Sequence, residues 1–504
     1  MSDALNNSGA TESNGSFRPA LQLMCGRAAA FAVTFLIPVL LSRIFDKVEF
    51  GTYKQVFLVV YSIYGIGQMG MAECLLYFLP SFPEAAGRYV MNSILMLFVT
   101  GLACFVGLTV AGNRVAMWLN NPALEQYMWI AGACLLLMLT SCALETAMIA
   151  RKRYRWATVT YASSDILRGA LLVGFALTTR NLKLVLMSAL VFYAIRVAGL
   201  FLYARSEFRR DLHVDWSKLR HQLSYTLPFA LAVLIEVIQT NYHMYAVSWH
   251  FDAATFAIYA VGCLQIPLTD FLASPASNVM MVRIGEELRE GRQQHVLPIW
   301  HDTCRKLSLA FFPTVALLIV TAHRVITLLF TDRYAASVPI FMMWSLTILY
   351  AILQTDGILR VLAETRFLVV MNLARLAAIA AVMNSALLAF GLQGPVIATL
   401  CGGFVAKTVA LWRISRRLDV PMKRLMPWWN LGGIALMAML AAVPAALVSA
   451  RLALPSIYVL PLAGLVYLGG YTALLWIFGV LNESEKRAIA NIFGRYAVLV
   501  RKPE

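Results

Sequence analysis

The sequence predicts an all-α integral membrane protein with about fourteen transmembrane helices, and three observations support this fold class. Hydrophobic residues make up 60% of the 504 residues, and they gather in runs of about 20, the length that an α-helix needs to cross a hydrocarbon core about 30 Å thick. Charged residues account for only 13%, against about 25% in soluble proteins. The basic residues behind the net charge of +16 lie mainly in short connections between apolar runs, which is typical of cytoplasmic loops rather than of nucleic-acid-binding surfaces.

A polar tail over residues 1–18, expected to be disordered and cytoplasmic, precedes a first apolar segment that is too long for a signal-peptide core. The apolar runs then predict helices at 19–44, 56–79, 89–110, 125–150, 157–178, 183–204, 222–249, 253–282, 301–322, 336–358, 366–390, 394–413, 428–450 and 455–480. Residues 205–221 combine basic and apolar residues at helical spacing and predict an amphipathic cytoplasmic linker. A basic cytoplasmic loop at 414–427 and a cytoplasmic tail at 481–504 complete the chain.

The distribution of lysine and arginine predicts the orientation. With a cytoplasmic amino terminus, the inner segments contain 28 basic residues and the outer segments contain 9. The positive-inside rule therefore places both termini in the cytoplasm.

Several function classes are disfavoured by what the sequence lacks. It has no H-E-x-x-H, G-x-S-x-G or Walker A motif, and its outer connections are too short to form a catalytic domain. The eight cysteines lie in or beside apolar runs, without the close pairing of a metal site. We therefore expect a transporter rather than an enzyme, with no metal, no cofactor and no nucleic-acid partner.

A weak internal repeat predicts two equivalent halves. Asp46, Phe50 and Tyr53 follow the first helix, and the same residue types recur after the seventh helix at a constant offset of 206, as Asp252, Phe256 and Tyr259. A second echo relates residues 115–120 to 325–330. Because six helices separate the copies, the halves at 19–204 and 222–413 are expected to be parallel, with a central cavity between them. The helices at 428–480 lie outside this symmetry.

The segment around the first repeat resembles a known family. Residues 41–43 (Leu-Ser-Arg) and 49–53 (Glu-Phe-Gly-Thr-Tyr), and later 329–334 (Leu-Phe-Thr-Asp-Arg-Tyr), are similar to motifs of the oligosaccharide flippases of the polysaccharide transporter family. That family, which includes O-antigen flippases, lies within the multidrug/oligosaccharidyl-lipid/polysaccharide superfamily. One departure is at residues 45–48, which read Phe-Asp-Lys-Val in place of the usual Leu-Gly-Pro-Glu.

The resemblance implies movement of undecaprenyl-diphosphate-linked oligosaccharides across the bacterial inner membrane by alternating access, for lipopolysaccharide or exopolysaccharide. The expected partners are the lipid-linked oligosaccharide and membrane lipids, with a polymerase and glycosyltransferases in the same process. Two alternatives remain open. One is a multidrug exporter of the same superfamily, for which an acidic cavity would be expected, and the other is a non-transport component of polysaccharide synthesis.

Basic residues within the spans are the candidate substrate contacts, because an ionised group near the bilayer centre costs about 2.5–3.5 kcal/mol or more and calls for a partner, a wet cavity or a function. They are Arg27, Arg168, Arg196 and Arg375, whose guanidinium groups suit a diphosphate. Asp165 lies one helical turn before Arg168, so this residue either forms a structural ion pair or lines the cavity as part of a polar pair.

Other charged residues in the spans are expected to reach the headgroups, to pair with a neighbour or to bind a coupling ion. Lys407 is expected to extend toward the headgroups, and Asp356 to pair with Arg360 four residues later. Glu236 and Asp270 lie near mid-membrane without a cation one turn away. They are candidates for a coupling site for Na⁺ or H⁺, or they neutralise cations on neighbouring helices.

Overall fold

The structure is a computed structural model that describes residues 33–209, 211–266 and 269–480. These residues are overwhelmingly helical and contain no β-strand, which confirms the predicted all-α membrane fold. They divide into two compact units, the first ending at Ala260 and the second beginning at Val261. The predicted tails at 1–18 and 481–504, and the candidate residue Arg27, lie outside the described residues.

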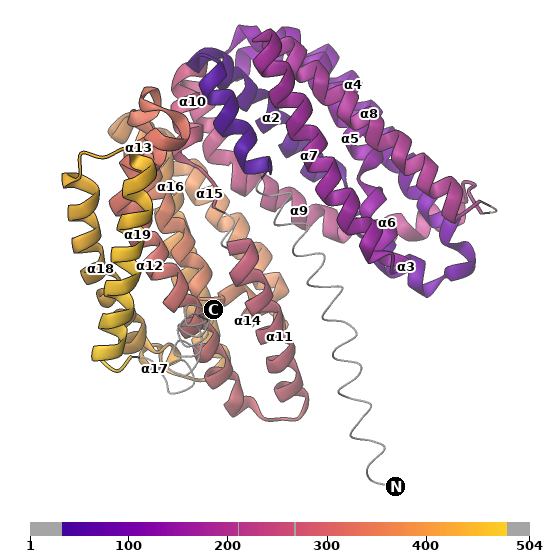
Figure 1. Cartoon of the computed structure of the whole chain (residues 1–504). Coiled ribbons are helices and arrows are strands. Elements are labelled where there is room, and N and C mark those ends of the chain that lie inside the picture. Colours follow the sequence, from indigo (N-terminus) through magenta and orange to yellow (C-terminus); the bar gives the residue numbers. More distant parts are fainter. Residues whose placement is uncertain (1–32, 210, 267–268, 481–504) are drawn as a thin grey trace, which may run out of the picture. The chain divides into compact units, whose positions relative to one another are not determined.

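The first unit consists of a helix over Val33–Ile44 and the helices that follow it in the chain. These are α2 (Lys47–Gly67), α3 (Leu75–Ser81), α4 (Ala86–Trp118), α5 (Glu125–Ser141), α6 (Ala143–Ala150), α7 (Tyr154–Thr179), α8 (Leu182–Glu207), α9 (Trp216–His250) and most of α10 (Ala253–Gly262) (Figure 1). Short 3-10 helices at Pro83–Ala85 and Pro122–Leu124 introduce α4 and α5.

The second unit contains the remaining helices. They are α11 (Ser274–Arg289), α12 (Val296–Phe330), α13 (Val338–Ser345), α14 (Thr355–Val361), α15 (Thr365–Phe390), α16 (Gly394–Leu418), α17 (Met422–Leu425), α18 (Trp428–Arg451) and α19 (Ser456–Ile477). A π-helical turn at Thr269–Ala273 precedes α11, and 3-10 helices occupy Gln293–His295, Asp332–Ser337, Leu346–Ile352 and Gly391–Gln393.

Several predicted spans are interrupted in the structure. The span predicted at 56–79 is divided between α2 and α3 by a turn in which Met69 and Gly70 have positive φ, a conformation that glycine adopts readily. The span predicted at 336–358 comprises α13, a 3-10 helix and part of α14. The segment predicted as a linker at 205–221 consists of the end of α8, a short connection and the start of α9. Helix α9 begins at Trp216 because Asp215 caps it, accepting hydrogen bonds from the backbone N–H groups of Ser217 and Lys218.

The two copies of the sequence repeat have the same local structure. Asp46 accepts a hydrogen bond from the Glu49 N–H at 2.8 Å at the start of α2. Asp252 accepts one from the Thr255 N–H at 3.0 Å where α10 begins. The phenylalanine and tyrosine that follow each aspartate are buried. The repeated residues therefore start a helix and anchor it by burying two aromatic rings.

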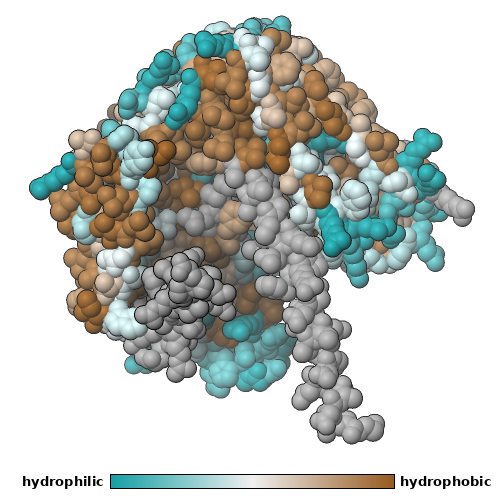
Figure 2. Space-filling model, viewed as in Figure 1, coloured by the Kyte–Doolittle hydropathy of each residue, from teal (hydrophilic) through white to brown (hydrophobic). Residues whose placement is uncertain are grey.

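Among the described residues, eight helices are long and apolar enough to cross a membrane, or nine when the bent pair Trp216–Pro228 and Ala230–His250 counts as one span. Many large apolar side chains on these helices are exposed, including Val110, Leu388 and Leu465. Figure 2 shows broad hydrophobic surface on the visible face, with hydrophilic residues gathered in patches. Such surface requires lipid around it, and the chain is a multi-pass membrane protein.

The last two long helices of the second unit pack against α12. Apolar residues of α18 and α19 form a cluster with residues of α12, and the three helices lie side by side (Figure 1). Arg324 of α12 donates hydrogen bonds to the carbonyl oxygens of Ser449, Leu452 and Leu454. It thereby satisfies the Ser449 and Leu452 carbonyl groups, which the end of α18 leaves without intrahelical partners, and binds the connection to α19 through Leu454.

Candidate functional site

The first polar cluster in the first unit is built around Arg168 on α7. Its Nη2 lies 2.7 Å from Asp165 Oδ1 and donates to the Thr34 hydroxyl at 2.6 Å. The Arg168 and Asp165 side chains are 14% and 23% exposed, and the buried Nε of Arg168 has no hydrogen-bond partner among the described residues. The pair expected from the sequence spacing is therefore present, and it links α7 to the Val33–Ile44 helix.

The second cluster joins three helices through Arg196 on α8. Its Nη2 lies 2.7 Å from Glu145 Oε2 on α6, and its Nη1 donates to the Ser164 hydroxyl on α7 at 2.9 Å. The Glu145 side chain is only 4% exposed, and its second oxygen has no hydrogen-bond partner in the part of the chain that the structure describes. Spacing in the sequence does not predict this pair, because 51 residues separate the acid from Arg196.

Taken together, the two clusters are electrically balanced, with two guanidinium groups and two carboxylates. A guanidinium group presents five donors in a planar fork, so each arginine has more donors than one carboxylate uses. An incoming anion would either share the guanidinium group with the carboxylate or displace the carboxylate. Each cluster is therefore an ion pair in which the arginine keeps donors that its carboxylate does not use.

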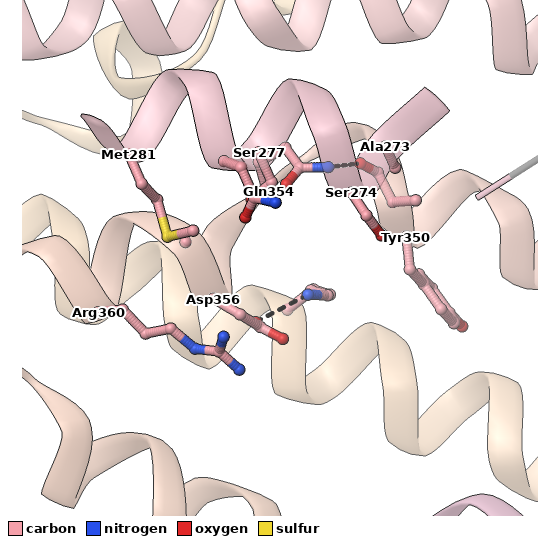
Figure 3. Close-up of a pocket in the computed structure, with 12 residues that line it drawn as sticks. Ala273, Ser274, Ser277, Met281, Tyr350, Gln354, Asp356 and Arg360 are labelled. Atoms are coloured by element: carbon pink, nitrogen blue, oxygen red, sulfur yellow. Dashed lines mark hydrogen bonds and ion pairs between the residues drawn. The ribbon is translucent and has the colours of Figure 1, made fainter. Parts of the chain in front are cut away.

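A polar cavity of about 290 Å³ lies in the second unit. It lies between α11, the 3-10 helix Leu346–Ile352, α14 and α16, and its lining residues are Ala273, Ser274, Ser277, Asn278, Met281, Tyr350, Ala351, Gln354, Asp356, Gly357, Arg360 and Lys407. Figure 3 shows Ser274, Ser277 and Met281 along one helix, with Asp356 and Arg360 opposite them. A side chain at Gly357 would come within 2.9 Å of the Ser277 hydroxyl, so glycine permits the close approach of α14 to α11.

An ion pair between α14 and α16 borders this cavity. The Lys407 ammonium donates to Asp356 Oδ1 and to the Thr355 hydroxyl, both at 2.9 Å. The expectation that Lys407 extends to the headgroups is therefore wrong, and so is the expected pair of Asp356 with Arg360. The folded chain places a closer cation beside this carboxylate, from a helix about fifty residues further along the chain. Arg360 lines the cavity and has no ion pair within the described part of the chain.

Arg375 has different surroundings on α15. It is the one basic residue along an otherwise apolar groove of about 500 Å³ between α15 and α16. Its buried Nε has no hydrogen-bond partner, and no carboxylate forms an ion pair with it, within the described ranges. Thus Arg168 and Arg196 belong to two neighbouring balanced clusters, since Ser164 and Asp165 are adjacent on α7, whereas Arg375 has no carboxylate partner among the described residues.

The two coupling candidates are not brought into a common site by the described residues. Glu236 is exposed on α9, and it has no ion pair in the part of the chain that the structure describes. The side chain of Asp270 lies outside the described residues. In the described ranges, no three histidine, cysteine, aspartate or glutamate side chains come together in a way that could hold a metal ion.

The sequence matches a family model described as "Polysaccharide biosynthesis protein" over residues 40–339. No curated protein sequence matches the chain.

Three solved structures have a similar fold. A lipid II flippase, MurJ, in an inward closed conformation matches with a TM-score of 0.68 and 13% identity, over 89% of this chain and 98% of that one. An inward-facing multidrug resistance transporter of the MATE family, in the MOP superfamily, matches with a TM-score of 0.59 and 12% identity, over 77% and 96% of the two chains. A MOP superfamily transporter from Pyrococcus furiosus matches with a TM-score of 0.54 and 14% identity, over 80% of this chain and 96% of that one. At these identities the likeness establishes the fold.

Proposed function

This chain belongs to the family of polysaccharide biosynthesis proteins, and we propose that it is a flippase for undecaprenyl-diphosphate-linked oligosaccharides in the bacterial inner membrane. The resemblance of residues 41–43, 49–53 and 329–334 to that class of protein is thereby confirmed at the level of the family. The observation that carries the proposal is the family membership combined with a fold shared with a lipid II flippase. A polysaccharide precursor assembled on a lipid has to cross the membrane, and this fold supports transporters.

The diphosphate is the part of the substrate that is most costly to place within the membrane. We propose that Arg168 and Arg196 bind it, together with Arg27 and Arg375, as the substrate passes between the leaflets by alternating access. Two observations support this role for the pairs in the first unit. Each guanidinium group is held by a single carboxylate, and the Arg168 Nε has no hydrogen-bond partner among the residues described. A diphosphate would replace one carboxylate contact by two charge-assisted hydrogen bonds.

Coupling to an ion gradient belongs to the same proposal. Glu236 and Asp270 are the residues proposed to take up H⁺ or Na⁺, and both termini are proposed to be cytoplasmic. A variant with Glu236→Gln is expected to lose the dependence of transport on the ion gradient. Transport that responds to the gradient as in the wild type would exclude Glu236 as the coupling residue.

The proposal is tested with purified protein in liposomes that contain a fluorescent undecaprenyl-diphosphate-linked oligosaccharide. Translocation is measured by the accessibility of the sugar to an enzyme added outside. Arg168→Ala is expected to lower the rate at least about tenfold, the effect of losing a hydrogen bond to a charged group. The matched control is Arg155→Ala, which removes an exposed arginine from the first turn of the same helix and is expected to translocate at the wild-type rate.

The alternatives give different results in the same liposomes. Wild-type protein that moves organic cations but not the lipid-linked sugar would identify a multidrug exporter. Protein that moves neither, yet changes the length or linkage of a polymer made by added glycosyltransferases, would identify a component of synthesis. Either result would refute the flippase proposal.

A further inference from the structure

The cavity in the second unit has one net positive charge. Lys407 and Arg360 contribute two cations, and Asp356 contributes one anion. The Lys407 ammonium is already hydrogen-bonded to Asp356 and Thr355. Arg360 is the cation that remains available, because it lines the cavity opposite α11 and forms no ion pair in the described ranges (Figure 3). The unbalanced charge is therefore a guanidinium group, which binds a carboxylate or a phosphate through two parallel hydrogen bonds.

Neutral hydrogen-bonding groups face the same space. Ser274, Ser277 and Asn278 contribute hydroxyl and amide groups from α11. Gln354 donates a hydrogen bond from its Nε2 to the Ala351 carbonyl oxygen at 2.6 Å. Its side-chain oxygen can then accept a hydrogen bond from a ligand. The mixture of donors and acceptors along these walls suits a ligand with several hydroxyl groups, since each hydroxyl both donates and accepts.

The backbone at Gln354 supports a functional interpretation of this wall. Gln354 has φ +48° at the break between the 3-10 helix and α14. A residue other than glycine in the left-handed region costs of order 1–3 kcal/mol and persists where the surroundings hold it in place. The strained residue is also one whose side chain lines the cavity.

We propose that this cavity binds one acidic sugar unit of the transported oligosaccharide, with Arg360 on the acidic group and the α11 side chains and Gln354 on the ring hydroxyl groups. This inference rests on the proposed flippase function and adds the chemical class of the substrate. One net positive charge is balanced by a monoanionic sugar, whereas a diphosphate would leave the cavity with an excess of negative charge beside Asp356. A volume of about 290 Å³ is at the lower limit for ligand sites, about 300 Å³, and accommodates a single sugar unit rather than the whole oligosaccharide.

The test compares two undecaprenyl-diphosphate-linked disaccharides that differ at one position, a carboxylate in one and a hydroxymethyl group in the other. In liposomes that contain both, the wild type is expected to move the acidic one at least about tenfold faster. Arg360→Gln is expected to reduce this ratio to near one. Arg366→Gln is the matched control, because it removes an exposed arginine near the start of α15 that does not line the cavity, and the ratio should stay at its wild-type value.

A binding measurement keeps the inference testable if Arg360→Gln folds poorly. Ser277→Cys, in a background with Cys401→Ser, introduces a thiol into the cavity wall. Glucuronate is expected to slow its reaction with a thiol reagent, and glucose is expected to have a much smaller effect. Inorganic phosphate that protects as well as glucuronate would show an anion site without sugar recognition and would overturn the proposal.

The two levels of the hypothesis fail in different ways. If the wild type moves both disaccharides at the same rate, the acidic-sugar site is refuted and the flippase proposal stands. If it moves neither disaccharide, the flippase proposal itself fails.

Discussion

Replacing Arg196 by leucine would remove the cation that neutralises Glu145 in the interior of the first unit. The two charged atoms lie 2.7 Å apart, and the side chains are 16% and 4% exposed. Breaking such a buried pair by removing one partner costs about 3–5 kcal/mol, because the remaining charge is buried and uncompensated. Arg196→Leu alone is therefore expected to be strongly destabilised, and so is Glu145→Leu.

The double variant Arg196→Leu with Glu145→Leu has a different expected outcome. Replacing a whole buried ion pair by apolar residues of similar volume is often neutral or stabilising. We therefore expect the double variant to recover most of the stability that each single variant loses. The free energy that couples the two sites is obtained from thermal or chemical unfolding of the four proteins in the same detergent.

The double variant also separates structure from function. If Arg196 binds the diphosphate, the double variant is stable but its translocation rate in liposomes falls at least about tenfold. If the pair only holds α6 and α8 together, the stable double variant transports at the wild-type rate. That second result would refute a role for Arg196 in binding the diphosphate, and the absence of any stability recovery would refute the buried ion pair.

Two further predictions concern stability. Gly51→Ala is expected to lower the unfolding temperature markedly, because the added Cβ would collide with the Ala253 carbonyl oxygen, and overpacking typically costs about 1–3 kcal/mol or more. The control is Gly107→Ala, whose added Cβ would have no atom within 4 Å. Equal unfolding temperatures for the two variants would contradict this packing. Glu364 lies in the connection between α14 and α15, and hydrogen bonds from Arg417 and Arg413 lower the pKa of its carboxyl group. A depressed carboxyl pKa stabilises the fold above the ordinary pKa and loses this effect as the pH falls through the lowered value. The stability advantage of the wild type over Glu364→Gln should therefore shrink between neutral and strongly acidic pH, and a difference that does not vary with pH would contradict the assignment.

The sequence was sufficient to predict the elements because lipid imposes a simple requirement. A chain in hydrocarbon has to satisfy its backbone hydrogen bonds internally, so long apolar runs become helices. Accordingly, α15, α16, α18 and α19 begin within a residue or so of their predicted positions. The interruption after α2 was not predicted, because Met69 and Gly70 do not interrupt the apolar composition.

Local spacing also predicted one of the ion pairs. Asp165 and Arg168 are three residues apart on one helix, so their contact follows from helical geometry alone. The repeated Asp, Phe and Tyr indicated only that the chain has two equivalent halves. The structure adds that residues 47–53 belong to α2, nine residues before the predicted start of that helix at 56.

The remaining polar contacts were decided by the tertiary structure. Glu145 with Arg196, and Asp356 with Lys407, join helices that are about fifty residues apart in the chain, and helical periodicity carries no information about which neighbouring helix faces which. The same holds for the cavity of the second unit, whose walls come from four separate elements. Sequence alone determined that charged residues fall within the apolar segments. Only the packing of the helices determined which of these charges are paired, because pairing depends on distances between helices that are remote along the chain.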